Sequence, residues 1–178
     1  MIWLGALVIG LAAGLLTGGS IENFARIKFR WPLIVLAGVV VREVVLLTPF
    51  GRVEGAEYVY VAALAAIVAW TILHFDRLPG IWFVTAGGLL NLTVILANGG
   101  RMPVAADLAG PLLSRGTIGQ YTLMGAGTNL SFLADWISIG PIREAYSPGD
   151  LMIALGIALV VFLGVRSPKV VTQTDIGS

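Results

Sequence analysis

The sequence PLIVLAGVVVREVVLL, residues 32–47, decides how the rest of the chain is interpreted. It is an apolar run close to the length of a membrane-spanning helix, yet its interior carries Arg42 and Glu43 side by side. A charged residue near the middle of a spanning helix costs at least ~2.5–3.5 kcal/mol on insertion scales. Such residues usually face the interior of a helix bundle, so Arg42 and Glu43 are the first candidates for a functional site.

Four other stretches are apolar and almost free of charge. The whole chain is 57% hydrophobic and 12% charged, with mean hydropathy +0.92, whereas a typical soluble domain is about 25% charged. A helix needs roughly 20 apolar residues to cross a bilayer, and somewhat fewer suffice when interfacial residues anchor its ends. The sequence therefore predicts an all-α integral membrane helix bundle. Its five transmembrane helices are expected near residues 2–18, 32–48, 57–74, 81–97 and 150–165.

We expect residues 1–166 to form one bundle and residues 167–178 to form a cytoplasmic tail. Lysine and arginine near span ends mark the cytoplasmic side, and this rule places the N-terminus outside and the C-terminus inside. The residues that set this orientation are Arg26, Lys28, Arg30, Arg77, Arg166 and Lys169. Because basic residues follow the first apolar run and do not precede it, Met1 to about Thr17 is interpreted as a retained span.

The composition also excludes several kinds of site. The chain has no cysteine and one histidine, His74, so disulfides, thiolate metal sites, iron–sulfur clusters and bis-histidine haem are excluded within it. A net charge of +1 offers no basic surface for nucleic acid. We therefore expect no cofactor, no metal and no nucleic-acid partner.

The long segment 98–149 is expected on the outer face of the membrane. Ala105–Leu113 and Thr128–Ile137 both suggest short helices, which we predict to be re-entrant or interfacial. Treating Ile118–Ile137 as a sixth span would bury Asp135 and reverse the charge rule, so five spans are favoured. Ser147-Pro148-Gly149-Asp150 is typical of a helix start, which predicts a capping role for Asp150.

Two polar residues of the predicted spans are expected at the same depth in the membrane. Arg42 and Asn91 each lie about ten residues from the inner end of their spans, so they reach a similar level. Adjacent residues are ~100° apart on a helix, so Arg42 and Glu43 should not pair squarely. The candidate ligand-binding residues are Arg42, Glu43, Asn91, Asn98, Arg101, Asp107 and Asp135.

Each of these candidates has a simpler structural interpretation that stays open. Arg42 can take Asp107 or Asp135 as its partner, or it can extend to lipid headgroups. Glu43 can be a structural, hydrogen-bonded acid. Asn98-Gly99-Gly100-Arg101-Met102-Pro103 is a helix stop followed by a tight turn, although Arg101 there also suits an anionic group.

Gly10, Gly14 and Gly18 repeat a small-residue spacing along the first predicted span. This spacing indicates close helix–helix packing, within the bundle, in a homo-oligomer or against a partner in a membrane complex.

Four short motifs carry a resemblance to a known family: the opening Met1-Ile2-Trp3-Leu4, Gly-Gly-Ser at 18–20, the turn at 98–103 and the helix start at 147–150. In these motifs the chain resembles a family of bacterial multi-pass membrane proteins, domain-of-unknown-function family 5317. The resemblance covers most of the chain. It implies a bacterial cytoplasmic (cell inner) membrane and carries over no catalytic residue.

Three functions remain open at this point. The first is a non-enzymatic membrane protein whose outer-facing pocket binds a small ligand, a lipid or a quinone-like molecule, or moves a solute. The second is an accessory subunit of a larger membrane complex. The third is an intramembrane enzyme that uses Glu43 with Asp107 or Asp135 as an acid–base pair.

Overall fold

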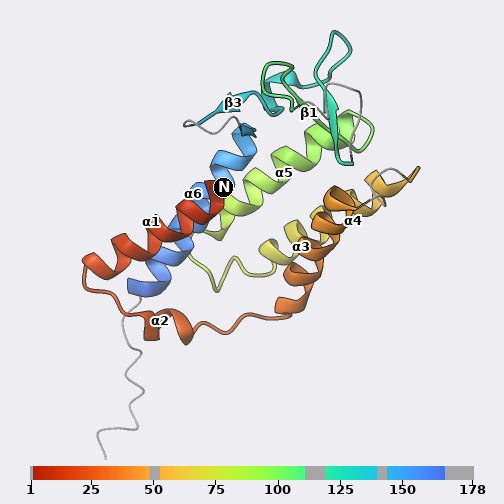
Figure 1. Ribbon diagram of the computed structural model, residues 1–178. Helices are drawn as coiled ribbons and strands as arrows, with labels where there is room; N and C mark the ends of the chain where they lie inside the picture. Colours follow the sequence, from red (N-terminus) through yellow and green to blue (C-terminus); the bar gives the residue numbers. More distant parts are fainter. Residues whose placement is uncertain (1, 49–52, 111–118, 140–143, 167–178) are drawn as a thin grey trace, which may run out of the picture.

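The computed structural model of the chain describes residues 2–48, 53–110, 119–139 and 144–166. Most of these residues are helical, and a helix occupies each of the five places where a span is expected. Figure 1 shows the long helices side by side, with the strands gathered at one end. The six α-helices of the described ranges are α1 (Ile2–Leu16), α2 (Ile21–Ala25), α3 (Pro32–Leu47), α4 (Ala56–Ile72), α5 (Ile81–Ala97) and α6 (Pro148–Arg166).

Helix length does not support five spans. Within the described residues α6, with 19 residues, is the one helix that is both long and apolar enough to cross a membrane. Helices α1, α4 and α5 are apolar but have 15, 17 and 17 residues. Gly55 and Gly80, both with φ 88°, precede α4 and α5 and fix where these helices start. The predicted tail, 167–178, lies outside the described residues.

The long helices form a row in the order α1, α6, α5, α4, α3, so the first and last helices of the chain are neighbours. Glycine allows α1 to approach α6 closely: a Cβ on Gly10 would lie 2.4 Å from the carbonyl oxygen of Ala158, and one on Gly14 would lie 3.0 Å from Val165 Cβ. Gly10 and Gly14 thus serve packing within the chain. Gly18 faces open space with φ +87°, and a homo-oligomer through this face stays a prediction.

The connection between α2 and α3 is fixed to the end of α4 by two aromatic side chains. Trp70 Nε1 donates a hydrogen bond to the carbonyl of Arg30 (2.7 Å), and the Arg30 N–H donates to His74 Nε2 (3.0 Å). Because Nε2 accepts, Nδ1 carries the proton and donates it to the Trp70 carbonyl (2.8 Å). His74 is fully buried and stacks on Trp70, so neither ring nitrogen is free to bind a metal.

The segment after α5 differs most from the sequence prediction, because its described residues form turns and short strands and not two short α-helices. Its described residues, 98–110, 119–139 and 144–146, are called the cap below. A parallel pair joins β1 (Met102–Val104) to β2 (Tyr121–Leu123), and an antiparallel pair joins β3 (Ile137–Ser138) to β4 (Ala145–Tyr146). Between the two pairs the chain makes one 3₁₀ turn, η3 (Ser131–Leu133).

Neither predicted cap helix is present in the described residues: residues 105–110 contain only a turn, and the helical part of residues 128–137 is only the single turn η3. Residues 111–113 of the first prediction lie outside the described residues. Backbone pairing explains the second case, because the Asp135 N–H donates to the Pro103 carbonyl (2.9 Å). The Ala105 N–H donates in turn to the Asp135 carbonyl (2.9 Å), and Leu130 takes a left-handed conformation that ends any helical course. Residues 119–137 are not a continuous helix, so they do not form a sixth span.

Two apolar clusters, one at each end, hold the α3–α4 pair against the other helices. The cluster beneath the cap consists of Tyr60, Val94, Ile95, Met102 and Ala134, with Val41 and Tyr121 packed against it. The cluster at the opposite end consists of Trp70, Leu78, Ile81 and Val160, with Val35 packed against it. The polar side chains described next lie at the cap end.

Candidate functional site

Arg42 lies where α3 meets α1 beneath the cap. Its Nη1 is 3.0 Å from Glu43 Oε1, and its guanidinium carbon lies 5.1 Å from the centre of the Trp3 ring. The prediction that the two neighbours do not pair is therefore wrong. Their Cβ atoms diverge on the helix, but both side chains are long enough to bend across its surface. The Arg42 and Glu43 side chains are 27% and 41% exposed, so the pair can be reached from outside the helix row.

The second part of the site is a hydrogen-bonded network between α5 and α6. Asn91 Nδ2 donates to Asp150 Oδ1 (2.9 Å), and Ser147 Oγ donates to Asn91 Oδ1 (2.7 Å). The Asp150 N–H donates to Ser147 Oγ, and the Ser147 N–H donates to Asp150 Oδ2. This reciprocal arrangement is a capping box, which confirms the predicted capping role of Asp150. Arg42 interacts electrostatically with the same carboxylate, so Asn91 and Arg42 lie in one region, as their equal depths in the predicted spans indicate.

The cap contributes Gln120, Tyr121 and Asp135. Gln120 is fully buried, and neither its Oε1 nor its Nε2 has a hydrogen-bond partner; the Oδ1 of Asp135, a residue only 5% exposed, also has none. The Tyr121 hydroxyl interacts with Gln120, but not at hydrogen-bonding geometry. A buried polar group left without a partner costs ~1–3 kcal/mol, so these side chains are held in place by the surrounding fold.

The backbone of β1 holds both Gln120 and Asp135 in the cap. The two residues bond to opposite edges of this strand: the Met102 N–H donates to the Gln120 carbonyl (2.7 Å), and the Asp135 N–H donates to the Pro103 carbonyl (2.9 Å). Residues far apart in the sequence are thus placed on either side of one short strand. This pairing is long-range, and nothing in the local sequence near Gln120 indicates it.

Burial dominates the electrostatics of the cap residues. Loss of solvation raises the pKa of Asp135 to about 8; the nearby Asp150 carboxylate raises it further and Arg42 opposes the shift. Burial also raises the pKa of Tyr121, again opposed by Arg42. Asp135 therefore carries a proton at neutral pH, although it lies near a cation.

Three predicted site residues lie outside this cluster. Asp107 is exposed, and the ion pair of Arg42 is made with Glu43 and not with Asp107. Arg101 Nη2 pairs with Glu57 Oε2 at 3.2 Å and ties the turn after α5 to the start of α4. Asn98 holds the cap, because its Nδ2 donates to the Asn129 carbonyl and its Oδ1 accepts from the Asn129 N–H, both at 2.9 Å.

Replacing Asn98 tests this holding role. Asn98→Leu removes both side-chain bonds to the backbone of Asn129, so we expect residues 121–129 to exchange amide hydrogen about tenfold faster, equivalent to the loss of one or two hydrogen bonds. Hydrogen–deuterium exchange with mass spectrometry measures the change. Asn98→Asp keeps the acceptor and should lie between the two. Unchanged exchange in Asn98→Leu would show that other contacts hold the cap.

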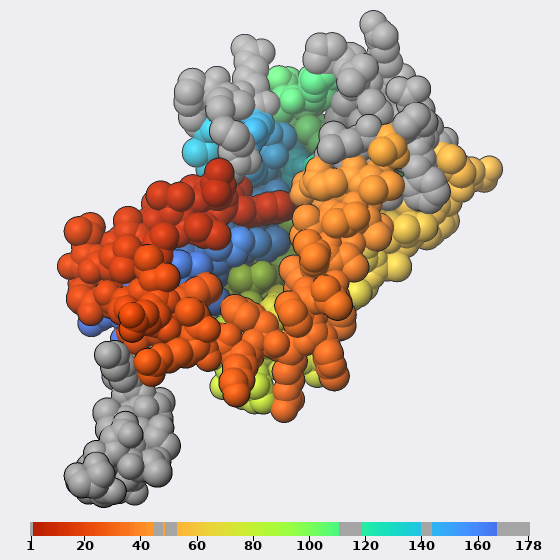
Figure 2. Space-filling model, turned by 60° about the horizontal axis from the view of Figure 1, so that its bottom comes forward, coloured from red at the N-terminus to blue at the C-terminus, as the bar shows by residue number. Residues whose placement is uncertain are grey.

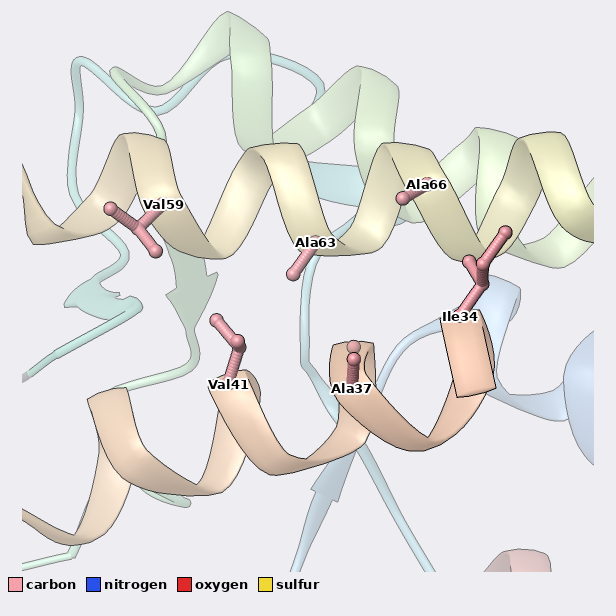
Figure 3. A pocket seen from close by; sticks show the side chains of 7 residues that line it. Ile34, Ala37, Val41, Val59, Ala63 and Ala66 are labelled. Atoms are coloured by element: carbon pink, nitrogen blue, oxygen red, sulfur yellow. The ribbon is translucent and has the colours of Figure 1, made fainter. Parts of the chain in front are cut away.

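Two hollows lie beside the cluster. One, of about 310 Å³, runs between α3 and α4 and is lined by the apolar side chains shown in Figure 3. The other, of about 460 Å³, is polar and lies between the end of α5 and residues 122–129 of the cap. Within the described ranges no group of His, Cys, Asp or Glu side chains could hold a metal ion.

The cluster that the structure assembles is called the Arg42 cluster below. It unites four of the predicted residues with others that sequence reasoning did not assign to a site. Its members are Trp3, Arg42, Glu43, Tyr60, Asn91, Gln120, Tyr121, Asp135, Ser147 and Asp150. It combines one guanidinium with several carboxyl, amide and hydroxyl groups, an arrangement suited to hydrogen bonding and charge complementarity.

Comparison with known proteins gives a family and no described activity. No curated protein and no solved structure matches the chain. The profile of a family described as "Family of unknown function (DUF5317)" matches residues 26–162, which is more than half of the chain. This range includes α3, α4, α5, the cap and most of α6. The chain therefore belongs to the DUF5317 family.

Proposed function

We propose that the chain is a multi-pass protein of a bacterial cytoplasmic membrane, in which α1, α3, α4, α5 and α6 all cross the bilayer. Large apolar side chains exposed on the outer surfaces of the row support this, among them Leu4 (65%), Ile9 (66%) and Leu33 (72%). Soluble monomers rarely expose broad apolar surfaces. Seventeen helical residues span ~25 Å, which thinning of the bilayer can accommodate. The N-terminus and the cap then face outward and the C-terminus lies in the cytoplasm.

We further propose that the Arg42 cluster binds a small ligand, a lipid or a quinone-like molecule near the outer face, or takes part in moving a solute. The single observation that carries this is the pair of buried, unpartnered groups, the Gln120 amide and Asp135 Oδ1, beside a partly exposed cation. Charged residues within a membrane protein usually mark a binding site or a pathway. A purely structural cluster would have paired these groups internally.

Native mass spectrometry of the protein extracted with its lipids tests the proposal. The wild-type protein should carry an adduct of defined mass, and Arg42→Ala should lose at least about nine-tenths of it, because one charge-assisted hydrogen bond contributes ~1.5–3 kcal/mol. Arg77→Ala is the matched control, since it removes an arginine from the opposite end of the row. A wild-type protein without any adduct, or equal adducts in both variants, contradicts ligand binding at this cluster.

The α3–α4 hollow favours a second candidate, an accessory subunit of a membrane complex. Its walls include Ala37, Gly38, Ala63 and Ala66, and small residues of this kind let a neighbouring helix approach closely in a bilayer. Gentle extraction followed by size analysis tests it: a larger complex that Ala63→Leu disrupts supports a subunit role. A free monomer in native membranes counts against it.

A further inference from the structure

The two ends of the helix row, α1 and α3, approach each other and leave a hollow between them. Figure 2 shows this hollow between α1 (red) and α3 (orange), with α6 (blue) and α5 (green) at its floor. At the cap end Arg42 and Trp3 bridge it. At the opposite end Val35 of α3 packs into the apolar cluster of Trp70, Leu78, Ile81 and Val160. The hollow is thus bounded at both ends and open along its side.

One apolar residue of each helix is placed beside this hollow by the position of the Trp3–Arg42 contact. Leu7 follows Trp3 by one turn of α1, and Val39 precedes Arg42 by one turn of α3, so helical periodicity places both below the bridge on the same faces. Leu7 is 42% exposed and Val39 is 44% exposed. In a membrane a side opening with such apolar residues beside it suits a hydrocarbon chain from the bilayer.

The head of the hollow is polar and carries both signs of charge. Arg42 and Glu43 lie side by side and are both partly exposed. Behind them, Asp135 Oδ1 and Gln120 Oε1 are acceptors without donors. A phosphate group complements the guanidinium. A primary ammonium complements the acceptors, because it supplies three N–H donors, and a quaternary ammonium supplies none.

We propose, building on the function proposed above, that the ligand of the Arg42 cluster is a phospholipid with a phosphoethanolamine headgroup. Its phosphate contacts Arg42, its ammonium lies towards Glu43 and Asp135, and one acyl chain lies in the hollow between α1 and α3. Trp3 packs under the guanidinium at the level where the headgroup meets the chain, the depth that tryptophan favours in membrane proteins.

The test uses the full-length protein in nanodiscs that contain equal amounts of phosphatidylethanolamine, phosphatidylcholine and phosphatidylglycerol with identical acyl chains. Native mass spectrometry after release should show phosphatidylethanolamine retained at least about tenfold over each of the other two, the effect of one charge-assisted hydrogen bond. Arg42→Gln removes the contact to the phosphate, which all three lipids carry, so it should lower retention of each of them; Glu43→Gln should abolish the preference for phosphatidylethanolamine. Val39→Trp, which fills the hollow, should lower retention of phosphatidylethanolamine about tenfold.

Val40→Trp is the matched control for Val39→Trp, because it adds the same indole one residue along α3, where the side chain is 51% exposed on a different face. It should leave retention unchanged. Soluble glycerophosphoethanolamine, which has the headgroup without chains, should not displace the lipid at millimolar concentration. Displacement by it shows that the headgroup binds without help from the hollow and overturns the placement of the chain.

The outcomes separate the two proposals. Retention of phosphatidylglycerol or phosphatidylcholine in place of phosphatidylethanolamine overturns the headgroup assignment but leaves a lipid site. An Arg42-dependent adduct that is not a lipid overturns the lipid inference and leaves ligand binding intact. Equal retention of all three lipids in the wild type and in Arg42→Gln, with no other adduct, overturns both.

Discussion

Gly87→Ala should be among the most destabilising single substitutions of this chain, because it forces α5 and α6 apart where their backbones touch. A Cβ on Gly87 would lie 2.4 Å from the carbonyl oxygen of Gly149 and 2.9 Å from the backbone nitrogen of Ile153. Neither atom belongs to a side chain that could rotate away. Overpacking a tight contact costs ~1–3 kcal/mol and more when backbone must shift, so we expect a loss of at least ~3 kcal/mol.

The loss should extend to the Arg42 cluster. Asn91 lies one turn beyond Gly87 on α5, and its amide is bonded to Ser147 and Asp150 at the start of α6. Separation of the helices lengthens these bonds. The thermal midpoint in mild detergent measures the stability, and native mass spectrometry measures any bound ligand in the same sample.

Gly5→Ala is the control for this substitution. It changes glycine to alanine inside α1, where an added Cβ meets nothing within 4 Å. Alanine is favoured over glycine in a helix by ~0.5–1 kcal/mol, so Gly5→Ala should leave the thermal midpoint unchanged or raise it slightly. If Gly87→Ala behaves in the same way, the close approach of α5 and α6 is not present in the folded protein.

The positions of the long helices could be predicted from the sequence because the signals that define a helix are local. Each long helix is a local apolar run whose ends are marked by glycine, proline or a capping residue, as at Pro32 and Ser147. The spacing of Gly10 and Gly14 also indicated a close contact, and α6 proved to be the helix that fills it. These features are local in the sequence, so a single sequence carries them.

The cap and half of the Arg42 cluster could not be predicted in this way. Thr128–Ile137 has the composition of a short amphipathic helix, yet the Asp135 backbone pairs with residues about 30 positions earlier. Gln120 reaches the cluster only through the same long-range pairing. Arg42 and Asn91 could be placed at one level because the rise per residue of a straight helix converts sequence position into depth. A strand of three residues offers no comparable way to place Gln120 from its position in the sequence.

Asp135→Asn should make the protein more stable at neutral and alkaline pH. Burial raises the pKa of the Asp135 carboxyl to about 8, against an ordinary value of 3.8. Between these two values the folded protein holds a proton that the unfolded chain releases. Stability therefore falls as pH rises from about 4, by up to ~1.4 kcal/mol per pH unit, and levels off above about pH 8.

Asparagine has the shape of the protonated acid and cannot ionise. The ordinary pKa and pH 7 are roughly three pH units apart, so the wild type loses about 4 kcal/mol of stability over this range. Asp135→Asn should not show this loss. We expect the thermal midpoint of Asp135→Asn to exceed that of the wild type at pH 7 and to exceed it further at pH 8. Below pH 4 the two proteins should melt together.

The decisive measurement is the slope of the thermal midpoint against pH between 5 and 8, in detergent of constant composition. The wild type should show a fall that Asp135→Asn lacks, and Asp107→Asn, which removes an exposed carboxyl of the cap, should retain the wild-type slope. Equal slopes in wild type and Asp135→Asn would mean that Asp135 is ionised in the folded protein. In that case Arg42 would outweigh the combined effect of burial and Asp150, and the carboxylate would be paired with the guanidinium.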